Sequence, residues 1–325
     1  MLDLPATRAV AFYDHATEQD SFLEAVLEGL SRPQPAIPCR FLYDERGSAL
    51  FDRICELEEY YPTRTETAIL ARHGRDIAAL AGPEAQLIEL GSGSSVKVRL
   101  LLQAMDRPAA YVAVDISREH LRRAAQALAA DFPGVAVIAV CADYAEGFPL
   151  PEVAAPGRRI AFFPGSTIGN LEPEEALAFL RRWCRRLGPD AAMAVGVDLK
   201  KDARVLHAAY DDSLGVTAAF SLNLLARANA ELGADFDLEG FVHEARYDED
   251  RGRVEIHLRS LKDQTVQVAG RRFGFARGDR LHVEHSYKYA VGEFQDLARR
   301  AGFSAGPVFT DPAGLFSVHY LTTRP

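Results

Sequence analysis

A turn at residues 88–97, IELGSGSSVK, places small residues and a lysine directly after an apolar run that ends with Glu89 and Leu90. Glycine lets a ligand approach the backbone closely, and ligands of open α/β sheets lie at the carboxyl ends of the strands. The turn that begins at Gly91 is therefore a candidate ligand-binding loop. A dinucleotide site favours GxGxxG, whose third glycine permits close packing of the following helix. The turn here reads GSGSSV and lacks that third glycine.

Two further acids stand at the ends of the next two apolar runs. Asp115 ends the run YVAVD, and Asp143, followed by Tyr144, comes after VAVIAVC. A carboxylate at Asp115 can accept hydrogen bonds from both ribose hydroxyls of S-adenosylmethionine, which needs no cradle for a pyrophosphate. Asp143 is placed to bind the adenine amine, with Tyr144 beside the ring. The ordered set predicts the core of a S-adenosylmethionine-dependent methyltransferase.

The elements that must position these residues alternate in the rhythm of a parallel sheet with helices on both faces. We expect five strands in one open sheet, at residues 86–91, 111–117, 135–141, 159–166 and 192–199. The expected helices lie at 95–105, 118–132 and 172–188. After a helix that begins at 291, candidate strands at 307–311 and 315–323 would complete the sheet as a hairpin.

An insertion with a different pattern interrupts this core. Residues 201–233 are helical in pattern, and from 242 to 289 the period-two alternation and glycine turns predict antiparallel hairpins. The N-terminal part is mostly helical and holds a loop at 41–66 that is rich in aromatic and charged residues. We therefore expect a Rossmann-like core from residues 63–199 and 288–325. A discontinuous α+β substrate-binding domain would comprise residues 1–62 and 200–287.

Composition narrows the class of protein. The chain has 325 residues, of which 48% are hydrophobic and 26% charged, which is typical of a globular protein. A net charge of −9 argues against a nucleic-acid partner, which would require clustered basic residues. The four cysteines show no metal-ligand spacing, and no apolar run approaches the ~20 residues that span a bilayer. We expect a cytoplasmic monomer without a metal or membrane partner, acting on a small molecule.

Longer blocks of the sequence carry a family resemblance. These blocks are IPCRFLYDERGSALFDRICELEEYYPTRTE, IELGSGSSVKVRLLL, FFPGSTIGNLEPEEA, AAYDDSLGVTAAFSLNLLARANAELGADFD and HVEHSYKY. In order and spacing, from about residue 37 to the C-terminus, they resemble the histidine Nα-methyltransferases of the ergothioneine pathway. The resemblance implies a class I methyltransferase core with a substrate domain. It also implies an enzyme that trimethylates the α-amine of free L-histidine to hercynine.

The resemblance also implies roles for individual residues. Gly91, Lys97, Asp115 and the pair Asp143-Tyr144 would hold S-adenosylmethionine. The residues implied to bind histidine are Tyr60, Gly165, Asn170, Tyr210, Glu284 and Ser286, with Tyr43 and Phe51 near the amine. Among these, Asn170, Tyr210 and Tyr43 would be catalytic.

Methyl transfer from a sulfonium is an in-line displacement, so the enzyme must chiefly align the two reactants and exclude water. The Asn170 amide both donates and accepts hydrogen bonds, so it could hold the carboxylate and orient the amine, with Tyr210 as a second donor. Aromatic faces could stabilise the methylated cation. Glu284 and Ser286 lie two apart in an expected strand and so share a face, where they could hydrogen-bond the two imidazole nitrogens.

Structural roles remain open for each of these residues. Asn170 could be the N-cap of the next helix, Tyr210 a core residue, Glu284 a solvated strand acid and Lys97 a helix-surface lysine. Tyr43, Phe51 and Tyr60 could be packing residues. His282 and His285 show no metal spacing and receive no catalytic role. At the level of function, the alternatives are a methyltransferase for another amino acid or aromatic amine, and a ligand-binding sensor without activity.

Overall fold

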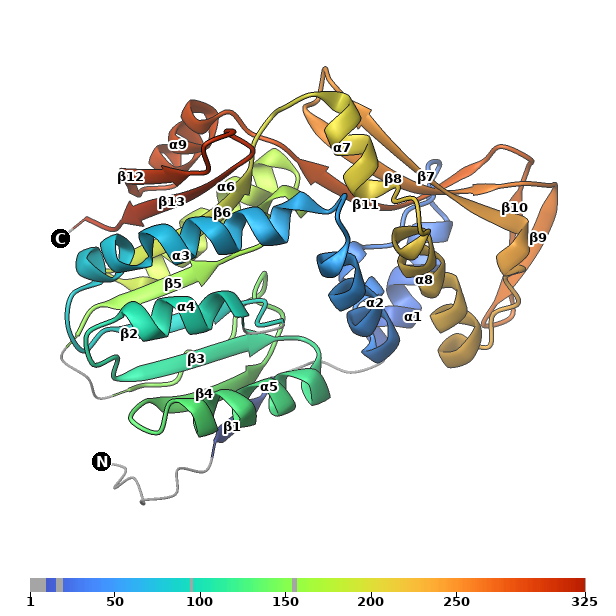
Figure 1. Ribbon diagram of the computed structural model, residues 1–325. Coiled ribbons are helices and arrows are strands. Elements are labelled where there is room, and N and C mark those ends of the chain that lie inside the picture. The colour runs from blue at the N-terminus through green and yellow to red at the C-terminus, as the bar shows by residue number, and fades with distance from the viewer. Residues whose placement is uncertain (1–9, 16–19, 94–95, 154–156, 325) are drawn as a thin grey trace. The chain divides into compact units, whose positions relative to one another are not determined.

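A computed structural model describes residues 10–15, 20–93, 96–153 and 157–324 of the chain (Figure 1). Ser94 and Ser95 of the glycine-rich turn lie outside the described residues. The chain divides into two compact units. The first comprises Pro62–Lys200 and Lys288–Pro325 together with a short N-terminal strand, and the second comprises Thr17–Tyr61 and Lys201–Tyr287. Within the described residues, no helix is long and apolar enough to cross a membrane.

The first unit is built on an eight-stranded sheet in the order β1-β4-β3-β2-β5-β6-β13-β12. Its strands are β1 (Ala11–Asp14), β2 (Gln86–Leu90), β3 (Ala110–Asp115), β4 (Ala136–Cys141), β5 (Arg159–Phe163), β6 (Ala192–Asp198), β12 (Ser304–Thr310) and β13 (Phe316–Thr322). The first six are parallel, and β13 runs antiparallel to both β6 and β12. The predicted five strands and their closing hairpin are confirmed, and with them the class I methyltransferase core.

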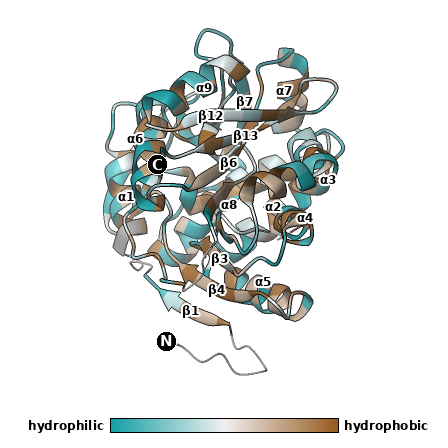
Figure 2. Ribbon diagram, turned by 90° about the vertical axis from the view of Figure 1, so that its left-hand side faces the viewer, coloured by the Kyte–Doolittle hydropathy of each residue, from teal (hydrophilic) through white to brown (hydrophobic). Residues whose placement is uncertain are grey.

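Helices cover both faces of this sheet. The helices are α3 (Tyr61–Ala81), α4 (Val96–Ala104), α5 (Arg118–Asp131), α6 (Pro173–Leu187) and α9 (Val291–Arg300). Apolar residues of α3, α4 and α5 share one core cluster with inward residues of the strands, so these three helices lie on one face (Figure 1). On the other face, Phe179 of α6 packs on Phe163 and Phe294 of α9 packs on His319. In Figure 2, β3 and β4 are mostly hydrophobic, whereas α6 and α9 alternate hydrophobic and hydrophilic residues.

Strand β1 corrects one part of the expected division. We expected residues 1–62 in the second unit, but Ala11–Asp14 pairs in parallel with Ile138–Cys141 of β4 and extends the core sheet. Four residues at a sheet edge are too short for period-two alternation to be visible in the sequence. The strand is held by backbone hydrogen bonds to β4, which the sequence pattern does not reveal.

The second unit combines helices with antiparallel strands, as the sequence predicts. Its helical elements are α1 (Asp20–Leu30), η1 (Cys39–Leu42), α2 (Glu45–Glu56), α7 (Ala203–Tyr210), α8 (Val216–Leu232) and η3 (Leu238–Gly240). Its strands are β7 (Phe241–Asp248), β8 (Arg253–Ser260), β9 (Gln264–Val268), β10 (Arg271–Phe275) and β11 (Arg280–Tyr287). They form a three-stranded sheet in the order β11-β8-β7 and a separate β9-β10 hairpin.

Helix α2 shows that the expected loop at residues 41–66 is wrong. Asp44 caps this helix by accepting a hydrogen bond from the Gly47 backbone nitrogen at 2.7 Å. Gly47 lies so close to the preceding chain that a β-carbon there would stand 1.7 Å from the Leu42 carbonyl oxygen. An isolated glycine in a helical pattern is tolerated at some cost in stability, and here it permits the tight approach with which the helix begins.

Candidate functional site

The glycine-rich turn lies at the carboxyl end of the parallel strands. Gly91 follows β2 with a φ of +78°, which favours glycine, and its nitrogen donates to the Val114 carbonyl at 2.8 Å. A β-carbon at Gly91 would stand 3.6 Å from the Tyr144 ring. Because Asp115 ends β3 and pairs in register with Cys141 of β4, the structure brings Gly91, Asp115, Asp143 and Tyr144 to one edge of the first unit.

The two acids at this edge are held in the same way. Oδ1 of Asp115 accepts from the Ser117 nitrogen, and Oδ1 of Asp143 accepts from the Ala145 nitrogen, each at 2.8 Å. A carboxylate has two oxygens with about four lone-pair sites, so these turns leave capacity for a ligand. Burial raises the pKa of Asp115, and the hydrogen bond from Ser117 opposes that shift. Hydroxyl donors of a ligand would stabilise the ionised form further.

If Asp115 accepts hydrogen bonds from both ribose hydroxyls of S-adenosylmethionine, as the sequence predicts, its replacement with alanine should weaken binding by ~1.5–3 kcal/mol, because a charged acceptor is lost. Isothermal titration calorimetry measures this directly. Glu119→Ala, which removes an exposed acid at the start of α5, is the matched control and should bind as the wild type does. Unchanged affinity in Asp115→Ala would remove Asp115 from the site.

Lys97 is not a helix-surface lysine. Its side chain is 15% exposed, and Nζ lies 2.6 Å from Oε2 of Glu66, whose side chain is fully buried on α3. The same Oε2 accepts a hydrogen bond from the Gly165 backbone nitrogen at 2.8 Å. Sequence reasoning missed Glu66, although its position three and four residues before Ile69 and Leu70 puts it on the apolar face of α3. An acid on a buried helix face was the available signal.

Glu89, the acid that precedes the turn, lies in the core. It is 2% exposed and accepts a hydrogen bond from the Tyr111 hydroxyl. Burial raises its pKa to about 8, while Tyr111 and the Lys97 ammonium oppose the shift. Burial therefore favours the neutral form of Glu89, which belongs to the core of the first unit.

Asn170 ends the short helix η2 (Thr167–Asn170), which follows β5 and two residues in the left-handed region, Gly165 and Ser166. The Ser166 hydroxyl accepts from the Asp198 backbone nitrogen at 2.9 Å, which fixes this turn against β6. The N-cap of α6 is Glu172, whose nitrogen donates to Glu175 at 2.9 Å. The alternative in which Asn170 is the N-cap is therefore wrong.

In the second unit, the predicted aromatic residues form one cluster. Tyr43 packs on Phe51 with ring centroids 5.5 Å apart, Phe51 on Tyr60 at 6.2 Å, and Tyr60 on Tyr210 at 6.1 Å. Phe220 of α8, which sequence reasoning missed, contacts both Tyr43 and Phe51. The cluster joins η1, α2, α7 and α8, so its members could not be recognised as neighbours from spacing along the chain.

Tyr210 reaches the strand that carries the other candidate substrate residues. Its hydroxyl donates to the Ser286 hydroxyl at 3.0 Å, and both residues are buried. His243 of β7 holds the end of α7 through contacts with the Tyr210 carbonyl at 2.8 Å and the Ser221 hydroxyl at 3.1 Å. Burial lowers the pKa of His243, so this missed residue is neutral and acts as a support.

A β-bulge sets which face of β11 carries Glu284. His282 pairs with His257, but Glu284 pairs with Ile256, so Val283 is an extra residue on β11. His282 and Glu284 therefore lie on opposite faces although they are two residues apart. The register is regular from Glu284 to Ser286, which confirms that these two share a face. On the other face, His282 stacks on His285 and contacts His257 edge to face.

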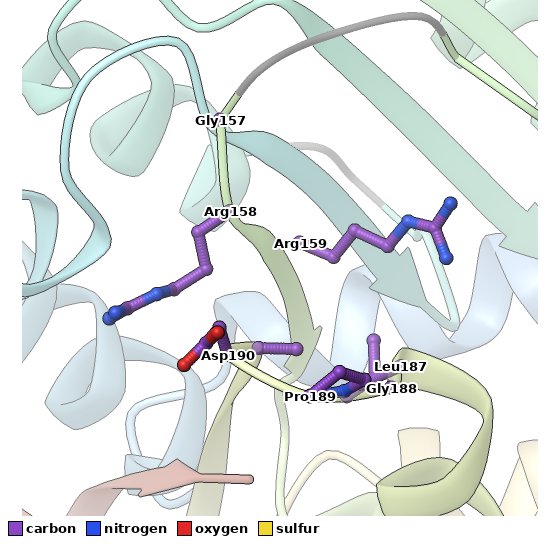
Figure 3. A pocket seen from close by; sticks show the side chains of 8 residues that line it. Gly157, Arg158, Arg159, Leu187, Gly188, Pro189 and Asp190 are labelled. Atoms are coloured by element: carbon purple, nitrogen blue, oxygen red, sulfur yellow. The ribbon is translucent and has the colours of Figure 1, made fainter. Parts of the chain in front are cut away.

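A surface hollow at the opposite edge of the core sheet is not a candidate site. Residues 157–159 and 187–191 line it, at the start of β5 and β6. The guanidinium groups of Arg158 and Arg159 point to opposite sides in Figure 3, so the charged groups do not converge on one ligand. Among the residues that the structure describes, no three His, Cys, Asp or Glu side chains are grouped to hold a metal ion.

The candidate residues are thus divided between the two units. The first unit holds Gly91, Lys97, Asp115, Asp143, Tyr144, Gly165 and Asn170, and the second holds Tyr43, Phe51, Tyr60, Tyr210, Glu284 and Ser286. Comparison with known proteins identifies the family of the chain. Residues 22–323 match the model of a family described as histidine-specific, S-adenosylmethionine-dependent methyltransferases. The chain is 41% identical over 308 residues to a histidine N-alpha-methyltransferase of Mycolicibacterium smegmatis, covering 92% of this chain and 95% of that protein. It is 39% identical over 301 residues to a protein of the same name from Mycobacterium tuberculosis, covering 90% of this chain and 92% of that protein.

A fungal protein extends the similarity. Over 293 residues the chain is 36% identical to ergothioneine biosynthesis protein 1 of Neurospora crassa, covering 86% of this chain and 33% of that protein. The family match at residues 22–323 spans every candidate residue of both units. The chain therefore belongs to the family of S-adenosylmethionine-dependent, histidine-specific methyltransferases.

Proposed function

We propose that this methyltransferase transfers methyl groups from S-adenosylmethionine to the α-amine of L-histidine, in three rounds that give hercynine for ergothioneine biosynthesis. The observation that carries the proposal is the group formed by Tyr210, Ser286 and Glu284 beside the aromatic cluster of the second unit. We further propose that the enzyme acts as a cytoplasmic monomer and needs no metal.

The carboxyl edge of the first unit fits the methyl donor. Gly91 leaves the turn open to a close approach, Asp115 and Asp143 present carboxylates, and Tyr144 lies beside Gly91. Lys97 would bind the donor's carboxylate. When bound, S-adenosylmethionine supplies a methyl group on a positively charged sulfonium. The protein then has to hold the acceptor amine in line and exclude water, an alignment worth as much as ~7–11 kcal/mol.

The acceptor must present a neutral amine. The α-amine of a free amino acid is mostly protonated at pH 7, so the site must bind the neutral form or help the amine to lose its proton. Burial raises the pKa of Tyr60 far above its usual range, so this phenol stays neutral and serves as a hydrogen-bonding or packing group. Asn170 would orient the amine and the carboxylate together, because its amide both donates and accepts.

Successive methylations change what the site must stabilise. Each methyl removes an N–H donor, and the product carries a fixed positive charge. Aromatic faces attract such cations at ~0.5–2 kcal/mol each. The cluster of Tyr43, Phe51 and Tyr60 offers those faces, and Phe220 packs behind Tyr43 and Phe51 to hold them.

Selection of histidine would depend on Glu284 and Ser286. A carboxylate and a hydroxyl on one face of β11 can pair with the two imidazole nitrogens. A substrate ring without nitrogens would leave the Glu284 carboxylate without a hydrogen-bond donor from the substrate. Because that loss is costly in a closed site, the site would select against apolar analogues of histidine.

Mass spectrometry tests the proposal. The chain would be incubated with S-adenosylmethionine and a panel of amino acids, and mono-, di- and trimethylated products would be measured. Trimethylhistidine as the main product supports the proposal. If another amino acid is methylated in preference to histidine, that amino acid is the substrate. If the ligands bind but no product forms, a ligand-binding sensor without activity is favoured.

Replacing Asn170 with alanine is expected to lower kcat/KM for histidine about tenfold or more, the effect of leaving a ligand carboxylate or amine without its partner. Binding of S-adenosylmethionine should stay close to the wild-type value. Glu172→Ala, which alters the N-cap of α6, is the control. It should lower the free energy of unfolding by ~1 kcal/mol and leave turnover unchanged. Wild-type kcat/KM in Asn170→Ala would exclude Asn170 from the substrate site.

A further inference from the structure

Glu66 is a fully buried acid that contacts two candidate site residues through one atom. Its Oε2 lies 2.6 Å from the Lys97 ammonium and accepts from the Gly165 nitrogen at 2.8 Å. Lys97 is one of the residues proposed to bind S-adenosylmethionine, and Gly165 is one of those proposed to bind histidine. Glu66, Lys97 and Gly165 all lie in the first unit. One carboxylate oxygen thus connects the two sets of contacts.

The surrounding backbone is shaped to admit this carboxylate. A β-carbon at Gly196 of β6 would stand 2.0 Å from Oε1 of Glu66, so the acid lies directly against bare backbone. A β-carbon at Gly165 would stand 3.8 Å from Lys97 Nζ, which puts the ammonium beside the turn before Asn170. That turn has two successive residues in the left-handed region, with φ of +77° and +58°, and the bond from Glu66 helps to hold it.

Burying an ion pair is a poor way to stabilise a fold. The desolvation of two charges offsets much of their attraction, and well-packed apolar residues often do as well or better. What the pair does provide is orientation. A lysine side chain carries about 2 kcal/mol of rotamer entropy, and a side chain already fixed does not lose that freedom when a ligand binds. An ammonium has three N–H groups, so a single carboxylate partner does not exhaust it.

We propose that Glu66 is a positioning residue, which orients Lys97 toward the carboxylate of S-adenosylmethionine and fixes the Gly165 turn for histidine. The inference deepens the proposed function and rests on it for the identity of the two ligands. Glu66 itself touches neither ligand and acts through its two partners.

Glu66→Gln is the principal test because it preserves the shape of the side chain and removes its charge. S-adenosylhomocysteine should bind about 10- to 100-fold more weakly by calorimetry, the change expected when a hydrogen bond to a charged group is lost. KM for histidine should rise at saturating S-adenosylmethionine. Asp76→Asn, an exposed acid on the same helix, is the matched control and should change neither value.

A double-variant cycle separates positioning from general stabilisation. If Glu66 acts on the donor through Lys97, adding Glu66→Gln to Lys97→Met should weaken S-adenosylhomocysteine binding no further. Additive effects would overturn the inference, as would wild-type affinity in Glu66→Gln. Should Glu66→Gln fail to fold, Glu66→Asp is the second variant. It keeps the negative charge but shortens the side chain by one methylene, which moves the carboxylate away from Lys97 and Gly165. It should bind S-adenosylhomocysteine several-fold more weakly, and unchanged affinity would again overturn the inference.

These outcomes are distinct from failure of the proposed function. Binding of S-adenosylhomocysteine can be measured whichever amino acid is methylated, so the role of Glu66 toward Lys97 is tested even if histidine is not the substrate. Conversely, the wild-type enzyme could trimethylate histidine while Glu66→Gln changes neither the affinity for S-adenosylhomocysteine nor KM for histidine. In that case the proposed function stands and the inference about Glu66 is wrong.

Discussion

Replacing Glu284 with alanine is expected to weaken the binding of histidine by ~2–3 kcal/mol and to shift the enzyme's substrate preference toward phenylalanine or tryptophan. The acid shares a face of β11 with Ser286, which accepts a hydrogen bond from Tyr210. Without the acid, the imidazole loses a charged partner, while an apolar ring no longer leaves a carboxylate unpaired. Asn170 and Tyr210 remain, so methyl transfer itself should persist.

Competition assays with mixed amino acids would measure the shift. Glu255→Ala is a matched control, because Glu255 pairs with His285 in the register of β8 and β11 and so lies on the opposite face. It should leave the preference unchanged. If Glu284→Ala keeps the wild-type preference for histidine, Glu284 does not bind the imidazole, and the assignment of histidine loses its main physical support.

Replacing Lys288 with methionine is expected to lower the free energy of unfolding by about 3–5 kcal/mol. Lys288 and Asp198 are both fully buried in the first unit, with Nζ 2.7 Å from Oδ2. Removal of the ammonium would leave a carboxylate buried without its ionic partner at the end of β6, and that uncompensated charge is the source of the cost. Urea denaturation of the two proteins would measure the difference.

The control for this prediction is an exposed pair in the same unit. Lys200 contacts Glu293 at 2.7 Å, but both side chains are at least 42% exposed. Lys200→Met should therefore cost no more than ~1 kcal/mol, because water screens such pairs. A similar small cost for Lys288→Met would show that the buried pair adds little to the stability of the core.

The sequence predicts the core sheet well because buried parallel strands read as continuous apolar runs between helices. It also predicts that Gly91, Asp115 and Asp143 lie at one edge of the sheet, since parallel strands carry their carboxyl ends to one side. The segment at 41–66 was predicted as a loop from its aromatic and charged residues, whereas Asp44 caps a helix there and Gly47 permits a close backbone approach. Local sequence patterns therefore do not predict the structure of a segment whose conformation depends on contacts outside that pattern.

Residues defined by spatial neighbours were the least predictable. Phe220 becomes part of the aromatic cluster only when α2 and α8 pack together, and His243 of β7 supports Tyr210 at the end of helix α7. The bulge at Val283 leaves no mark in composition, yet it decides that His282 and Glu284 face opposite ways. Glu66 was missed as well, although an acid on an apolar helix face is visible in the sequence.

The four residues of β1 also protect the core sheet from aggregation. Their partner β4 reads AVIAVC, an uncharged run of six residues rich in β-branched and apolar side chains, and such runs pair readily with other chains when an edge is free. Ala11–Asp14 occupies that edge with its own backbone. A shortened chain that begins after residue 15 would keep every candidate ligand-binding residue. Its β4 would be an open edge on which strands of other chains could pair. We therefore expect such a chain to lose solubility rather than activity.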